Sequence, residues 1–244
     1  MEKKFKVGLI RVLTTEDQDI LLAHEKLLNQ YFPMLTVETK CIPDQYEGIH
    51  SPELGALAVP KIVETAKSFR NVDMIIVSCA DDPGVEEIRE ALPGIPVTGG
   101  GETTLALARK YGEKIGVLGI TDYAPKAYAK LKSDQLLIGR PDGVYSTLDL
   151  MTSKGRKSTV NMARKLKEQG ADVLALACTG MATIGIAKEL EEAAGIPVID
   201  PVMAEGLFAY FEYLKNKTAL GTEYFTAGKP VKCSVFLYGF VIKS

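Results

Sequence analysis

The stretch VDMIIVSCADDPGVEEIREALPGIPV at residues 72–97 aligns with a second stretch of the same chain, ADVLALACTGMATIGIAKELEEAAGIPV at residues 171–198. In both copies an aspartate stands six residues before a cysteine, and Gly-Ile-Pro-Val closes the unit. The matched residues are Asp73 with Asp172 and Cys79 with Cys178. This self-similarity predicts an internal duplication, in which each half presents one cysteine at the end of an apolar run.

Around this repeat, short apolar runs alternate with longer amphipathic stretches. The predicted strands are 6–12, 36–42, 72–78, 95–98, 114–120, 135–139, 172–177 and 196–199. The predicted helices are 16–31, 53–69, 102–111, 123–132, 157–169, 181–194 and 201–215. Several strands are apolar on both faces, as buried parallel strands require, so we expect an α/β protein.

The openings of the two halves also match, because KVGLIRV at 6–12 aligns with KIGVLGI at 114–120. We therefore expect two pseudo-symmetric open parallel-sheet lobes, which are duplicated flavodoxin-like halves. Residues 1–98 with about 206–244 are predicted to form the first lobe, and residues 99–205 the second. Ligands of open parallel sheets bind outside the carboxyl ends of the strands, so the site is expected in the cleft between the lobes.

The composition is typical of a globular protein, with 244 residues, 46% of them hydrophobic, and a net charge of -2. Basic and acidic residues are interspersed, so nothing predicts binding to nucleic acid or to a membrane. A small-molecule substrate is the expected partner. The apolar run at 7–13 is short, is interrupted by Arg11 and lacks a cleavage signal, which favours the first strand of a cytoplasmic protein.

The cysteines show no metal-ligand spacing, and we expect reduced thiols and no metal. No GxGxxG or GxxxxGK[ST] motif occurs, so a nucleotide cofactor is poorly supported. A buried cysteine after a strand is most often a small hydrophobe, and we interpret Cys41 and Cys233 in this way. The equivalent positions of Cys79 and Cys178 in the duplication favour a chemical role for that pair.

The paired cysteines suggest proton transfer at a carbon centre. Both are expected where a strand leads into a helix N-terminus, which would lower a thiol pKa toward neutrality. Gly84 and Gly180 would let the backbone approach a ligand closely. One thiolate could then remove a proton while the opposite thiol delivers one to the other face. The planar intermediate would carry charge on a carbonyl oxygen, which backbone N–H groups stabilise.

At these residues the sequence resembles the cofactor-independent Asp/Glu/hydantoin racemase superfamily, from the first strand to about residue 210. The loop SCADDPG, together with VTGGGET at 97–103, ACTGM at 177–181 and PVIDP at 197–201, is similar to the hydantoin and allantoin racemase branch. Amino-acid racemases of the superfamily typically follow the first cysteine with Asn-Thr, where this chain has Ala80-Asp81. The resemblance implies that Cys79 and Cys178 are the acid/base residues and that no metal, pyridoxal phosphate or nucleotide is needed.

Six residues near the cysteines are candidate substrate binders: Ala80, Asp81, Gly100, Thr121, Thr179 and Gly180. The glycines at 99–101 form either an anion nest or a simple turn into a helix that starts near Glu102. Thr121 follows a strand end, where its hydroxyl either binds substrate or caps a helix. We expect Asp82 to cap the helix that follows it.

Other polar and aromatic residues have competing interpretations. His24 and His50 are expected to have surface or packing roles. Tyr46 and Ile49 either shape a specificity pocket or anchor their loop. The apolar segment 231–244 is predicted to cover the first lobe or to form a homo-oligomer interface.

The leading hypothesis is a cofactor-independent racemase or epimerase acting on a 5-substituted hydantoin or a related ureido compound. The first alternative is an aspartate- or glutamate-type amino-acid racemase. The second is a two-lobed small-molecule-binding protein without chemistry, which would have thiols of ordinary reactivity.

Overall fold

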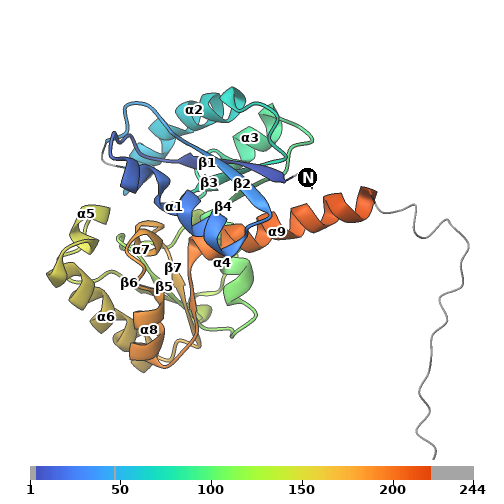
Figure 1. The fold of residues 1–244 in the computed structure, drawn as a ribbon. Helices are drawn as coiled ribbons and strands as arrows, with labels where there is room; N and C mark the ends of the chain where they lie inside the picture. The colour runs from blue at the N-terminus through green and yellow to red at the C-terminus, as the bar shows by residue number, and fades with distance from the viewer. Residues whose placement is uncertain (1–3, 47, 221–244) are drawn as a thin grey trace, which may run out of the picture.

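The computed structural model describes residues 4–46 and 48–220, which build two parallel sheets flanked by helices (Figure 1). The sheet orders are β2-β1-β3-β4 and β6-β5-β7-β8, so the two halves share one topology. The strands are β1 Phe5–Arg11, β2 Leu35–Cys41, β3 Met74–Ser78, β4 Val97–Gly99, β5 Ile115–Leu118, β6 Leu136–Gly139, β7 Val173–Leu176 and β8 Val198–Ile199. The predicted α/β fold with two lobes is confirmed.

The α-helices and two 3₁₀ segments connect these strands. They are α1 Gln18–Tyr31, α2 Pro52–Ser68, α3 Val85–Ala91, α4 Gly100–Ala108, η1 Lys126–Lys130, η2 Ser133–Gln135, α5 Thr147–Leu150, α6 Ser153–Glu168, α7 Gly180–Thr183, α8 Ala187–Ala194 and α9 Pro201–Leu220. The strands that lead to the two cysteines, β3 and β7, are fully buried inner strands that carry apolar side chains on both faces.

The repeated aspartates have the same structural role in both lobes. The Asp73 carboxylate accepts a hydrogen bond from the main-chain N–H of Lys6 at 2.8 Å, beside the start of β1. The Asp172 carboxylate accepts from the N–H of Lys114 at the same distance, beside the start of β5. Each aspartate thus joins its cysteine-bearing strand to the first strand of its lobe, which explains why the sequence repeat includes both residues.

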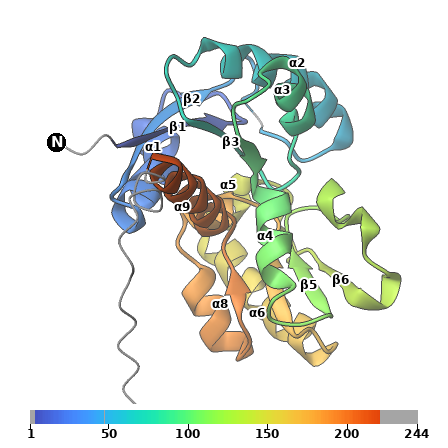
Figure 2. The ribbon, with the colours of Figure 1, turned by 90° about the vertical axis from the view of Figure 1, so that its right-hand side faces the viewer.

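Helices α4 and α9 lie side by side where the lobes meet (Figure 2). Val202 and Ala209 of α9 pack with Val7 and Leu9 of the first lobe, whereas Ala204 packs into the second. The division of the chain at residues 98 and 205 stays a prediction. The C-terminal segment 231–244, with Cys233, lies outside the described residues.

Two predicted helices are wrong in part. The segment 123–132 forms only the short η1, because Pro125 precedes it and Leu131 is already extended. The segment 181–194 divides into α7 and α8 at Gly185, whose φ of 60° belongs to the left-handed region. Helix α5 was not anticipated, and α3 was expected only as a helix after Asp82, without bounds. None of the helices in the described ranges is long and apolar enough to cross a membrane.

Candidate active site

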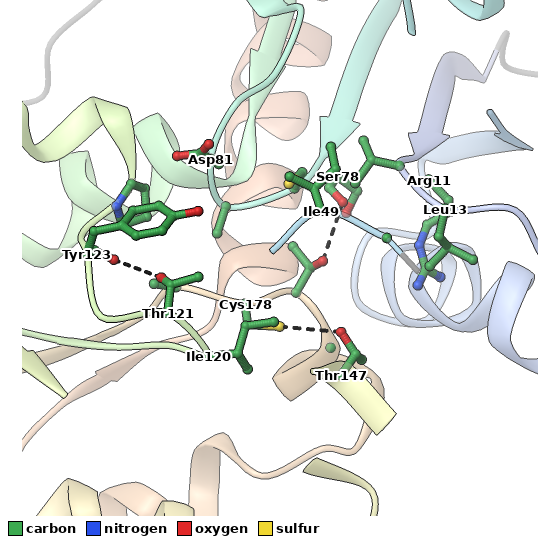
Figure 3. Close-up of a pocket in the computed structure, with 18 residues that line it drawn as sticks. Arg11, Leu13, Ile49, Ser78, Asp81, Ile120, Thr121, Tyr123, Thr147 and Cys178 are labelled. Atoms are coloured by element: carbon green, nitrogen blue, oxygen red, sulfur yellow. Dashed lines mark hydrogen bonds between the residues drawn. The ribbon is translucent and has the colours of Figure 1, made fainter. Parts of the chain in front are cut away.

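Cys79 and Cys178 line the same cavity between the two lobes (Figure 3). The cavity has a volume of about 80 Å³. Room for one water requires roughly 10–15 Å³ of such volume, so several waters or a small substrate core fit there. The lining also includes five of the six predicted substrate binders: Ala80, Asp81, Thr121, Thr179 and Gly180. The two copies of the repeat therefore supply facing walls of one site.

The Cys178 thiol lies among groups that favour its ionised form. Main-chain N–H groups of Gly180 and Met181 lower the pKa of the Cys178 thiol, and the Thr147 hydroxyl lies 3.9 Å from Sγ. The Arg11 guanidinium also lowers the pKa of this thiol. Burial outweighs these contributions, so the pKa of Cys178 is raised above its ordinary value.

The Cys79 thiol has a different environment. One main-chain N–H, that of Asp81, favours the thiolate, but the carboxylates of Asp81 and Asp82 both oppose it. Burial adds the largest contribution, so the pKa of Cys79 is strongly raised. The expectation that helix N-termini bring the pKa of both thiols toward neutrality is therefore wrong, because both cysteine residues are only 9% exposed.

The glycines at 99–101 form the turn from β4 directly into α4, with Gly99 at the N-cap, and the N-terminus of this helix binds the side chain of Asp82. Its two carboxylate oxygens accept hydrogen bonds from the N–H groups of Gly101 and Glu102, each at 2.7 Å. The prediction that Asp82 caps the following helix is wrong: it caps α4, and Gly84 stands at the N-cap of α3. Gly100 is not among the residues that line the cavity, and its N–H donates to the Cys79 carbonyl at 3.1 Å.

A family model described as Asp/Glu/Hydantoin racemase matches residues 20–205. The chain belongs to this family. It is 27% identical over 169 residues to a hydantoin racemase of Paenarthrobacter aurescens, which covers 66% of this chain and 70% of that protein. A hydantoin racemase of Pseudomonas sp. (strain NS671) is also 27% identical over 169 residues, covering 63% of this chain and 64% of that protein, just under two thirds.

Among solved structures, the allantoin racemase from Klebsiella pneumoniae has the same fold, with a TM-score of 0.71 and 21% sequence identity over 89% of each chain. Together these matches confirm the resemblance to the hydantoin and allantoin racemase branch. They indicate an enzyme of the racemase class, which is a class of isomerases.

In this racemase-family site, Asp81 and Tyr123 form part of the wall beside Cys79. The Asp81 carboxylate accepts from the N–H of Lys126 at 3.1 Å, and burial raises its pKa. Burial, and then the Asp81 carboxylate, raise the pKa of Tyr123. Ile49 lines the cavity, whereas Tyr46 is 76% exposed and is not part of the lining. Asp81 therefore contributes a carboxyl group to the wall of the cavity.

Arg11 and Thr147 line the cavity but were missed as site residues. Arg11 is 3% exposed, and its Nη1 donates to the Ile20 carbonyl at 2.6 Å. Burial lowers the pKa of Arg11 to about 10, so the guanidinium stays charged at neutral pH. A charged residue inside the otherwise apolar strand KVGLIRVL was the signal that could have revealed Arg11.

A buried polar network lies next to the cavity. His24 is fully buried, so the expected surface role is wrong and the packing role is correct. His24 Nδ1 lies 2.8 Å from Ser78 Oγ, and Ser78 Oγ donates to Glu205 Oε2 at 2.9 Å. Burial raises the pKa of Glu205 well above its ordinary value, which favours the protonated form of this side chain.

The remaining thiol and metal predictions concern other parts of the chain. Cys41 ends β2 and is half-buried, so it is not a fully buried core residue. Across residues 4–46 and 48–220, no three His, Cys, Asp or Glu side chains gather as a metal site would need. That the reaction needs no metal or cofactor stays a prediction.

Proposed function

We propose that the protein is a cofactor-independent racemase or epimerase that uses Cys79 and Cys178 for two-base proton transfer. The observation that carries this proposal is the meeting of the two repeated thiols at one small interlobe cavity. Two acid/base groups from opposite walls can reach opposite faces of one carbon, which inversion of a stereocentre requires.

In the direction that starts from a Cys178 thiolate, its sulfur takes the proton from the carbon next to the substrate carbonyl. The bonding electrons pass to the carbonyl oxygen and give a planar enolate. The Cys79 S–H then delivers its proton to the opposite face, leaving a Cys79 thiolate and a Cys178 thiol. One proton is taken and one is returned, and the other enantiomer reacts by the reverse sequence.

Cys178 is the better site for the thiolate of the free enzyme. Two N–H groups, the Thr147 hydroxyl and the Arg11 cation favour its ionised form. The two carboxylates beside Cys79 oppose ionisation there. Since both pKa values are raised, we expect kcat/KM to increase as the pH rises above neutrality.

The proposed substrate is a 5-substituted hydantoin or a related ureido compound. Such molecules carry ring or ureido N–H groups, which match the acceptor offered by Asp81. Aspartate and glutamate carry two carboxylates, and the Asp81 carboxylate would repel one placed near it. Apolar side chains of Ile49, Ile120 and Pro125 complete the wall and suit an apolar 5-substituent.

The test is proton NMR in deuterium oxide with each enantiomer of several hydantoins, allantoin, aspartate and glutamate. We expect loss of the α-carbon proton signal from both enantiomers of a hydantoin or allantoin. The amino acids should be inert. Absence of exchange across the panel, combined with tight binding of one compound, would favour a non-catalytic binding protein.

A further inference from the structure

His24 hydrogen-bonds to both cysteine-bearing segments, although it belongs to neither. Its Nδ1 contacts Ser78, the residue that precedes Cys79, at 2.8 Å. Its Nε2 contacts the Thr183 hydroxyl at 3.0 Å, and Thr183 ends α7, the short helix that follows Cys178. The imidazole therefore spans the two segments whose separation sets the distance between the thiols.

Both ring nitrogens of His24 have a hydroxyl within hydrogen-bond distance, and a neutral imidazole has one donor and one acceptor nitrogen with which to bind them. Burial and then the Arg11 cation lower the pKa of His24 and outweigh a hydrogen bond with the Thr179 backbone, so the neutral imidazole is favoured. The Ser78 hydroxyl also bonds to Glu205 Oε2, which ties the imidazole to α9.

The hydrogen bonds of His24 lie in a rigid environment. His24 and Glu205 are fully buried and Ser78 is 1% exposed. Glu205 belongs to α9, and a Cβ added at Gly100 would come within 2.8 Å of its Oε1 and 3.1 Å of the Cys79 carbonyl. This close packing restricts movement of the segment that carries Cys79. The hydrogen bonds of His24 therefore hold the Cys178 segment at a defined distance from it.

We propose that His24 is a positioning residue that sets the separation of the two thiols through its bonds to Ser78 and Thr183. This inference rests on the proposed two-thiol racemisation. Proton transfer from both faces requires each sulfur to approach the same carbon closely, and a misplacement of about 1 Å can lower a rate by about 100-fold. When the hydrogen bonds of His24 are lost, one thiol moves too far from the substrate carbon for proton transfer. The other thiol stays next to its own face of the substrate.

The test variant is Thr183→Val, which removes the hydroxyl at nearly constant volume. Its control is Thr159→Val, because Thr159 is a buried threonine of the second lobe whose hydroxyl bonds only within its own helix, to Gly155 O. His24→Asn is the second test variant, since its amide keeps a donor near Ser78 and is too short to reach Thr183.

The readout is the ratio of deuterium incorporation to inversion, measured from one pure enantiomer in deuterium oxide by NMR and optical rotation. A displaced second thiol lets the first exchange the proton and return a deuteron to the same face. We expect the ratio to rise roughly ten-fold in Thr183→Val and His24→Asn, within the about 100-fold range for a misplaced group. Wild type and Thr159→Val should have equal ratios. A purely structural role lowers exchange and inversion together, so an unchanged ratio in both test variants overturns the inference.

A second measurement does not depend on catalysis. Dibromobimane becomes fluorescent when it bridges two thiols, and Cys79→Ser protein supplies the background. Wild type and Thr159→Val are expected to form the Cys79–Cys178 bridge, and Thr183→Val to form it more slowly. Equal bridging in Thr183→Val and wild type overturns the inference. If wild type bridges but exchanges no proton of any substrate tested, the proposed function fails and the bridging rates alone decide the role of His24.

Discussion

The segments that carry Cys79 and Cys178 occupy equivalent places in the two lobes but differ in charge. The Cys79 segment continues with Asp81 and Asp82, whose carboxylates oppose a thiolate. The Cys178 segment continues with Gly180 and Met181, whose main-chain N–H groups favour a thiolate. Duplication thus retained the geometry of two thiols, while the surrounding side chains made their ionisation unequal.

This difference bears on how a pseudo-symmetric site handles two mirror-image substrates. A racemase catalyses both directions, so in the proposed mechanism each thiol acts once as base and once as acid. Because the two thiols ionise unequally, the free enzyme is expected to carry the thiolate that one enantiomer needs more often than the thiolate that the other needs. Substitutions near the cysteines can remove this difference in ionisation, and alkylation of the thiols can measure it.

The largest expected effect comes from removing one thiol. Cys178→Ser and Cys79→Ser should each lower the racemisation rate by about 10²–10⁴-fold, the usual contribution of a general acid or base. Polarimetry with each enantiomer measures the loss. Cys41→Ser is the control, because Cys41 is not part of the cavity lining. A variant of either repeated cysteine that racemises at the wild-type rate would exclude two-base chemistry.

The next prediction compares the thiols directly in the unliganded protein. Iodoacetamide should alkylate Cys178 roughly ten-fold faster than Cys79, since a difference of one pKa unit corresponds to a ten-fold difference in thiolate population. Both rates should rise with pH through the alkaline range, because both pKa values are raised. Mass spectrometry of quenched samples gives the two rates. Faster labelling of Cys79 would reverse the proposed assignment of the resting thiolate.

A smaller effect is expected from neutralising a carboxylate beside Cys79. Asp81→Asn removes one of the two charges that raise the pKa of this thiol, so Cys79 should be alkylated roughly three- to ten-fold faster, up to about one pKa unit. The alkylation rate of Cys178 should be unchanged, so the ratio of the Cys178 rate to the Cys79 rate should fall. Asp134→Asn, at an exposed position in η2, is the matched control. Equal acceleration of both thiols would point to loosened packing instead of electrostatics.

These comparisons also show what could be predicted from sequence. The repeat located both cysteines and the central strands, because the pattern of each unit is contained within fewer than thirty consecutive residues. It could not identify which N–H groups bind Asp82, since Gly101 and Glu102 lie on a different helix from the one that follows it. Glu205 was missed for the same reason: its partner Ser78 is 127 residues away.

The buried charge of Arg11 marks another limit of sequence reasoning. One arginine in a short apolar strand was visible, but its relation to Cys178 depends on how the lobes meet. The burial of the two thiols could not be predicted from the sequence either. The expected lowering of the thiol pKa values considered the local backbone, whereas desolvation by both lobes decided the outcome.

The smallest expected effect concerns the support of the Cys79 segment by Glu205. Burial raises the folded-state pKa of Glu205 above its unfolded value near 4.5. A carboxyl group with a raised folded-state pKa contributes stability fully below the unfolded pKa, and this contribution is lost as the pH rises toward the folded pKa. Gln at this position has no ionisation and keeps an acceptor for the Ser78 hydroxyl. The Tm difference, Glu205→Gln minus wild type, should therefore increase from pH 5 to pH 8 by a few degrees, at roughly 2–4 °C per kcal/mol for a chain of this size.

Thermal unfolding at several pH values measures this difference, with Glu90→Gln as the exposed control. If the Tm difference for Glu205→Gln stays constant with pH, Glu205 does not change protonation on folding. The Ser78 hydroxyl would then face a charged carboxylate. In that case a negative charge would lie on the Cys79 side of the site even at neutral pH, and Cys79 should be still less reactive relative to Cys178. The charge state of Glu205 therefore affects both measurements. A Tm difference that does not vary with pH should be accompanied by a larger ratio of the Cys178 alkylation rate to the Cys79 alkylation rate.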